Sequence, residues 1–136
     1  VDSPALAARL DRLVGEHGTR GGGRLPVYLQ VNVDADPAKA GFAPDALERD
    51  LEDLLGLPNL EIRGLMTVGF FTGGGEAARP TFARLRELSE RLREADLRLG
   101  PGLSMGMTDD FEVAIEEGST LVRVGRALFG ERPAPA

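Results

Sequence analysis

The sequence predicts an α/β fold in which parallel strands alternate with helices. Two patterns lead to this class. Leucine-rich segments with helical spacing alternate with short runs of β-branched and aliphatic residues along the 136-residue chain. The segments between successive strands are long enough to hold crossover helices, which parallel pairing requires. The apolar fraction of 42% supplies one buried core, so we expect residues 1–136 to form a single domain.

The first predicted elements are a helix and a strand. Ser3 can cap a helix that has Pro4 at its first position, and leucines then recur on one face. After a glycine-rich connector, residues 27–33 alternate apolar and polar side chains. This alternation predicts a strand with Gln30 and Asn32 on the face opposite its valines and leucine.

The middle of the chain repeats this order. Pro44 begins a second helix, whose leucines lie on one face as far as Gly56. A second strand is predicted near residues 61–68. The longest helix follows, over about residues 76–95, and its outer face carries Arg and Glu.

The last part of the chain predicts a strand over 103–105, a helix and a strand over 121–124. Thr108 is a plausible cap for that helix, and Asp109 and Asp110 would favour its first turn through the helix dipole. Adjacent carboxylates could also bind a metal ion, but neighbouring residues seldom converge on one ion. We therefore favour the helical interpretation.

Four strand and helix units amount to half of a (β/α)8 barrel, which needs roughly 250 residues. A doubly wound dinucleotide-binding sheet is less well supported, because no G-x-G-x-x-G opens a helix after a strand. We expect four adjacent parallel strands in chain order. Because the chain begins at Val1 and its next residues, Asp2 and Ser3, have the pattern of a strand end, we also expect a fragment.

Composition excludes several functional classes. The net charge is −6 and no long basic run is present, so nucleic acid is not an expected partner. The chain has no apolar run long enough to span a membrane and no signal-peptide pattern, so we expect a cytoplasmic protein with no membrane partner. Zero Cys and a single His exclude thiolate and multi-histidine metal sites.

Two glycine-punctuated segments follow the last two strands. In barrels, the loops after the final strands commonly bind phosphate through backbone N–H groups, hydroxyls and a helix N-terminus. Ordinary glycine-rich turns are the alternative, and the sequence leaves both open. The candidate residues are Ser104, Gly106 and Thr108 in the first segment and Gly125 and Arg126 in the second.

Arg123 is the sharper candidate. Strand alternation places it on the same face as Leu121 and Gly125, which would point its side chain into the barrel. A buried cation needs an acceptor. That acceptor is either an internal carboxylate or a bound ligand.

Residues 104–112, 118–125 and 128–130 together resemble the C-terminal signature of the pyridoxal phosphate homeostasis proteins. These YggS-like proteins are relatives of the alanine racemase N-terminal barrel. The resemblance continues upstream through residues 30–32 and 63–67, so that it covers nearly the whole chain. It implies that the chain is the C-terminal part of a (β/α)8 barrel, monomeric at full length, that binds pyridoxal 5′-phosphate.

The resemblance also implies site roles. A permanent cation beside the pyridine nitrogen disfavours its protonation, which makes the cofactor a weak electron sink. The family is regarded as a carrier or buffer of the cofactor without turnover. By resemblance, Ser104, Gly106 and Thr108 belong to the first phosphate loop, Gly125 and Arg126 to the second through backbone N–H groups, and Arg123 reaches the ring nitrogen or the phosphate.

The cofactor lysine of the family is missing from this chain. Lys39, the single lysine, matches the family's Lys-x-Gly loop and not the early-strand lysine that forms the Schiff base. We expect Lys39 to be a solvated loop residue.

Three functions compete. The first is a non-catalytic cofactor-binding protein. The second is a racemase-like pyridoxal phosphate enzyme, which would need a catalytic tyrosine, and Tyr28 is the only tyrosine present. The third is a phosphate-binding barrel enzyme without this cofactor, which would need an acid and a base that this sequence does not clearly offer.

Overall fold

The structure, a computed structural model, describes residues 1–69 and 74–130. Its four strands form one sheet in the order β1-β2-β3-β4, and each neighbouring pair is parallel. The predicted chain-order parallel sheet is therefore confirmed. The elements are α1 (Pro4–His17), β1 (Leu25–Gln30), α2 (Pro44–Leu55), β2 (Leu60–Met66), α3 (Gly75–Ala95), β3 (Gly102–Met107), α4 (Phe111–Glu116), β4 (Leu121–Arg123) and α5 (Arg126–Phe129).

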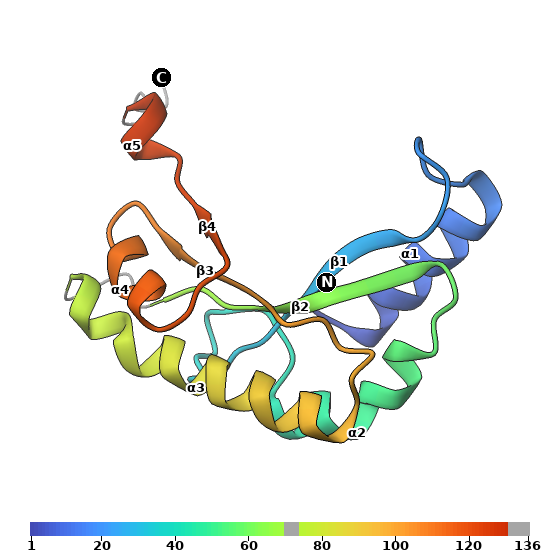
Figure 1. The fold of residues 1–136 in the computed structure, drawn as a ribbon, viewed down its shortest axis with the longest axis horizontal. Helices are drawn as coiled ribbons and strands as arrows, with labels where there is room; N and C mark the ends of the chain where they lie inside the picture. Colours follow the sequence, from blue (N-terminus) through green and yellow to red (C-terminus); the bar gives the residue numbers. More distant parts are fainter. Residues whose placement is uncertain (70–73, 131–136) are drawn as a thin grey trace.

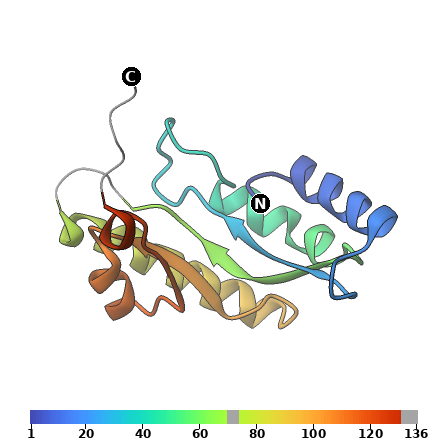
Figure 2. The same ribbon diagram turned by 90° about the horizontal axis from the view of Figure 1, so that it is seen from above.

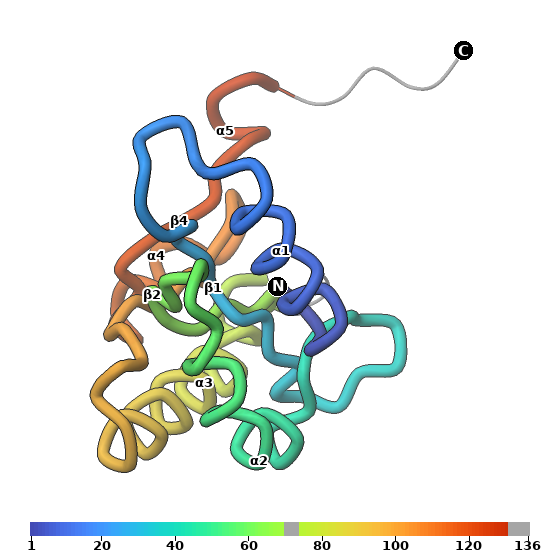
Figure 3. The backbone as a smooth tube through the Cα atoms, turned by 90° about the vertical axis from the view of Figure 1, so that its right-hand side faces the viewer, coloured from blue at the N-terminus to red at the C-terminus, as the bar shows by residue number. Residues whose placement is uncertain are grey.

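The helices lie mainly on one side of the sheet. Figures 1 and 3 show α2 and α3 below the strands, whereas α5 rises on the opposite side at the end of β4. Seen from above, the strands lie over the long α3 helix (Figure 2). The buried core joins these layers through Leu29 and Leu65 of the sheet, Leu47 of α2 and Phe82 of α3. No helix among the described residues is long and apolar enough to cross a membrane.

The first strand lies earlier than the sequence predicts. It spans Leu25–Gln30 in place of 27–33, and Val31 continues it only as an isolated parallel bridge to Phe42. Backbone hydrogen bonds continue past β1, because the Val31 N–H donates to the Met66 carbonyl at 2.8 Å and the Asn32 N–H donates to the Phe42 carbonyl at 2.9 Å. The side-chain amide of Asn32 donates to backbone carbonyls of the loop that follows.

The fourth helix starts later than the sequence predicts. It begins at Phe111, so Thr108 does not cap it. Asp110 instead accepts a hydrogen bond from the Met107 N–H at 2.6 Å, and this contact closes the turn between β3 and α4. Thr108 is left at the end of the strand, where its hydroxyl faces β4's loop.

Val1, which precedes α1 by three residues, pairs with the sheet. The amino group of Val1 donates to the Tyr28 carbonyl at 2.9 Å, and the Gln30 N–H donates to the Val1 carbonyl at 2.7 Å. These two bonds are the pattern of a parallel ladder. The prediction that the first residues form a strand end is consistent with this pairing.

Candidate functional site

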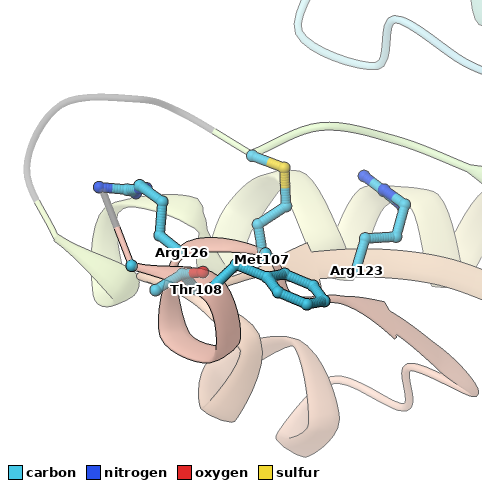
Figure 4. Close-up of a pocket in the computed structure, with 7 residues that line it drawn as sticks. Met107, Thr108, Arg123 and Arg126 are labelled. Atoms are coloured by element: carbon cyan, nitrogen blue, oxygen red, sulfur yellow. The ribbon is translucent and has the colours of Figure 1, made fainter. Parts of the chain in front are cut away.

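A hollow of about 590 Å³ lies where β3 and β4 end. Its size is in the range of small-molecule and cofactor sites. Arg123 and Arg126 lie on either side of Met107 in this hollow (Figure 4). Its lining residues are Met107, Thr108, Arg123, Gly125, Arg126, Phe129 and Gly130.

The two predicted loops meet at this hollow. The Ala127 N–H donates to the Thr108 hydroxyl at 3.4 Å, and the Arg126 guanidinium forms an ion pair with Asp109. Because consecutive parallel strands end at the same edge, residues twenty positions apart become neighbours. Convergence of the loop N–H groups on one phosphate stays a prediction.

Arg123 reaches back across the sheet from β4. Its Nη1 donates to the Ser104 hydroxyl at 2.8 Å and to the Ser104 carbonyl at 2.9 Å. Its Nη2 donates to the Thr67 carbonyl at 2.9 Å. Partial burial lowers the pKa of the Arg123 guanidinium from its ordinary value, and the nearby Asp110 carboxylate opposes this shift.

These contacts decide between the two acceptors that the sequence left open for Arg123. Every hydrogen-bond acceptor that the described residues offer it is neutral, and Arg123 takes part in none of their ion pairs. The internal ion pair with a carboxylate is therefore not observed in this part of the chain. Neutral acceptors orient the guanidinium but leave its charge available to an anion.

Ser104 and Gly106 lie behind the hollow and not in a loop. Both belong to β3, which runs to Met107. Ser104 is 3% exposed and its hydroxyl is engaged by Arg123. Gly106 has a φ of +97°, and a Cβ there would lie 2.6 Å from the Cβ of Ala114. Direct phosphate contact by these two residues is a prediction that their positions do not favour.

Gly125 and Arg126 lie at the start of α5. No heavy atom lies within 4 Å of the position that a Cβ on Gly125 would take. A ligand can therefore approach the backbone here without displacing protein atoms.

Several residues of the site carry no clear sequence signal. Met107 and Phe129 line the hollow as apolar walls, and the Thr67 carbonyl orients Arg123. A backbone carbonyl acts irrespective of its side chain, so no residue pattern could have identified Thr67. Phe129 could have been found as an apolar residue that follows a glycine-rich strand end.

Lys39 is not the solvated residue that the sequence predicts. Its side chain is 12% exposed, and its Nζ donates to the carbonyls of Val68 and Gly69 at 3.1 and 3.2 Å. The carboxylates of Asp34 and Asp36 lie 3.9 and 3.8 Å away. The prediction failed because Val68 and Gly69, whose carbonyls accept from Lys39, lie about thirty residues further along the chain.

Tyr28 lies away from the hollow. Its hydroxyl packs against Gly102, the first residue of β3, whereas the hollow lies at the end of that strand. The only tyrosine of the chain therefore does not line this hollow.

Comparison with known proteins identifies the family that the chain matches. The family described as alanine racemase, N-terminal domain, matches residues 1–133. The pyridoxal phosphate homeostasis protein of Pseudomonas aeruginosa is 47% identical over 133 residues, which cover 97% of this chain and 54% of that protein. The protein of the same name from Aquifex aeolicus is 50% identical over 107 residues, covering 78% of this chain and 46% of that protein.

Solved structures agree in fold. PipY of Synechococcus elongatus PCC7942, determined without PLP, superposes with a TM-score of 0.85 and 40% identity, covering 96% of this chain and 59% of that chain. The same protein with PLP bound gives a TM-score of 0.83 at 38% identity, with 96% and 58% covered. The chain thus spans about half the length of the relatives it matches, and its four strands correspond to half of a (β/α)8 barrel.

Proposed function

The chain belongs to the alanine racemase N-terminal domain family, and on this premise we propose that it forms the phosphate-binding part of a protein that binds pyridoxal 5′-phosphate. The proposed role is cofactor homeostasis, in which the protein holds and releases the cofactor without turning over a substrate. The names of the Pseudomonas and Aquifex relatives and the PLP-bound PipY structure support this role.

The observation that carries the proposal is the state of Arg123. A partly buried guanidinium is held by three hydrogen bonds to neutral acceptors at the rim of a cofactor-sized hollow. Burying a charge without a counter-ion is costly, so such a residue favours an anionic ligand. The phosphate group of pyridoxal phosphate meets that requirement.

The residues of the hollow fit this cofactor. Thr108 offers a hydroxyl, Gly125 an open backbone and Arg126 a backbone N–H at the start of α5, while the Arg126 guanidinium pairs with Asp109. When bound, the cofactor supplies an aldehyde that reacts with amines and a ring that stabilises carbanions. An arginine at the ring nitrogen would disfavour protonation of that nitrogen and weaken the second property, which suits a carrier or a racemase-like reaction with limited carbanion stabilisation.

A racemase-like function needs more groups than this chain brings to the hollow. Tyr28 packs at the other end of β3, and Lys39 is held by backbone carbonyls. We propose that the cofactor lysine lies in the part of the relatives that this chain does not match. An assay of alanine racemisation by the full-length protein tests the alternative, and measurable turnover would favour it. Cytoplasmic location and a monomeric state stay predictions.

The phosphate-binding role can be tested on the chain itself with pyridoxine 5′-phosphate, which has an alcohol in place of the aldehyde and cannot react with Lys39. In a ¹⁵N NMR titration, we expect saturable shifts of the Thr108, Gly125 and Arg126 amides at about millimolar concentrations. Pyridoxine without phosphate is the control and should cause much smaller shifts. Equal shifts with both compounds, or none with either, would contradict the proposal.

A further inference from the structure

Lys39 is a buried cation outside the hollow that the proposed function does not use. The loop that carries it, between β1 and α2, is held by its own polar groups. Asn32 donates through Nδ2 to the Asp36 carbonyl at 2.8 Å and to the Lys39 carbonyl at 3.1 Å. Gln30 donates to the Ala40 carbonyl at 3.0 Å. These hydrogen bonds hold the loop backbone at Lys39 without any contribution from the Lys39 side chain.

From this fixed loop the ammonium group reaches the end of β2. It donates to the carbonyls of both Val68 and Gly69, the two residues after Thr67. Asp34, whose side chain is 5% exposed, lies on the other side of the ammonium group at 3.9 Å. Two carbonyls at the start of a loop are thus satisfied by one cation from a neighbouring loop.

The segment that Lys39 holds is connected to the hollow through two sets of contacts. Thr67 accepts the hydrogen bond of Arg123 Nη2 through its carbonyl, and its own N–H donates to the Ser104 carbonyl at 3.1 Å. On the other route, Gly69 packs so closely that a Cβ there would lie 2.5 Å from the Asp110 carboxylate. That carboxylate in turn fixes the Met107 N–H at the hollow.

We propose that Lys39 is a positioning residue for the anion site: by holding Val68 and Gly69 it sets the Thr67 carbonyl that orients Arg123. This inference rests on the proposed function, since it assigns Lys39 a part in the binding of a phosphorylated ligand. Lys39 acts through the backbone and does not touch the ligand. Loss of its ammonium group lets the end of β2 move and leaves Arg123 with one acceptor fewer in place.

The test compares Lys39→Met with Arg84→Met in the NMR titration with pyridoxine 5′-phosphate. Arg84 is the matched control, because it bonds the same Asp34 at 2.9 Å but is 58% exposed and does not contact Val68 or Gly69. We expect Lys39→Met to weaken affinity by roughly threefold to thirtyfold, and Arg84→Met to leave it within about twofold. Lys39→Arg, which can donate to both carbonyls, should restore most of the affinity.

A second readout separates positioning from general destabilisation. The side-chain Nε–H signal of Arg123, assigned by its loss in Arg123→Lys, should shift in ligand-free Lys39→Met and stay in place in Arg84→Met. A folded Lys39→Met protein with unchanged affinity and an unchanged Arg123 signal would overturn the proposal. If the chain with the native residues does not bind pyridoxine 5′-phosphate at all, the proposed function fails instead.

Where Lys39→Met does not fold, Lys39→Gln takes its place, since its amide can still donate to one of the two carbonyls. We expect Lys39→Gln to weaken the affinity and to shift the Arg123 signal in the same way, by smaller amounts. Failure of both variants to fold would also overturn the proposal, because it would make Lys39 a requirement of the whole domain and not of the anion site.

Discussion

The two halves of the sheet are built differently. β1 and β2 have six and seven residues and are accompanied by α2 and α3 of 12 and 21 residues, which carry much of the buried core. β4 has three residues, α4 has six and α5 has four, and α5 buries no residue. The candidate site lies entirely at the end of this second half.

Polar contacts supplement apolar packing where β4 joins β3. The Ser119 hydroxyl donates to the Met105 carbonyl at 2.7 Å, and the Thr120 hydroxyl accepts from the Leu103 N–H at 2.8 Å. With Arg123, these side chains attach β4 to β3. Such contacts leave the strand end open to a ligand, whereas an apolar layer would fill the same space. The comparison teaches that stability and binding are carried by separate regions of one sheet.

The largest expected effect is on the stability of the first half. Leu47→Ala removes a fully buried side chain from α2 and should lower the free energy of unfolding by about 2–5 kcal/mol. Leu128→Ala, at a side chain that is 70% exposed in α5, should change it by less than about 0.5 kcal/mol. Urea denaturation followed by circular dichroism measures both. Similar losses would show that α5 is packed against the rest in solution.

The second prediction concerns binding at Arg123. Arg123→Gln removes a charge-assisted contact of roughly 1.5–3 kcal/mol, which corresponds to about a tenfold to hundredfold loss of affinity for pyridoxine 5′-phosphate. Its effect on the Tm should be small compared with that of Leu47→Ala, because no carboxylate among the described residues loses an ion-pair partner. Unchanged affinity with a lowered Tm would leave Arg123 a purely structural residue.

Alanine substitutions at Gly106 and Gly125 separate stability from binding within the second half. Gly106→Ala would place a methyl group 2.6 Å from Ala114 at a φ of +97° and should cost about 1–3 kcal/mol of stability. A Cβ at position 125 would have no heavy atom within 4 Å, so Gly125→Ala should keep the free energy of unfolding unchanged. Its affinity for pyridoxine 5′-phosphate should fall. Thermal melts and the NMR titration separate the two outcomes. Loss of stability in Gly125→Ala would contradict the open geometry described above.

The smallest expected effect is a pH dependence where the two halves meet. Arg79 of α3 bonds Glu117 at 2.9 Å, and this hydrogen bond lowers the pKa of Glu117 below its ordinary value of 4.5. A lowered pKa in the folded state means that the contact stabilises the protein above pH 4.5 and is lost as the pH falls through the folded value.

Glu117→Gln should therefore be slightly less stable than the native chain at pH 7, and the difference should shrink at an acidic pH below the folded pKa of Glu117. Urea denaturation of both proteins at the two pH values measures this. Arg86, which also bonds Glu117, retains Glu90 as a partner in the variant. A difference that grows in acid would mean that the sign of the pKa shift is wrong.

The order of the elements could be predicted because each depends on local spacing. Leucines every three or four residues define α2, and alternating residues define β1. The ends of the elements could not be predicted, because they depend on single side-chain contacts. The Asn32 side chain bonds the loop that follows β1, and Asp110 closes the turn that the sequence assigned to Thr108.

The site could be predicted only in part. Thr108, Gly125 and Arg126 meet because strand ends of a parallel sheet lie together, a rule that the sequence order already contains. The acceptors of Arg123 are mostly backbone carbonyls, which no side-chain pattern reveals. Lys39 was misjudged for a related reason, since its partners belong to a distant segment.

The chain-order sheet also has a consequence for synthesis on the ribosome. Each strand pairs with the strand made just before it, so the sheet can grow at one edge while the chain emerges at about 5–20 residues per second. Gly125 and Arg126 follow the fourth of these strands in the chain. Among these four units, the strands and helices that carry much of the buried core are therefore synthesised before the residues that complete the hollow.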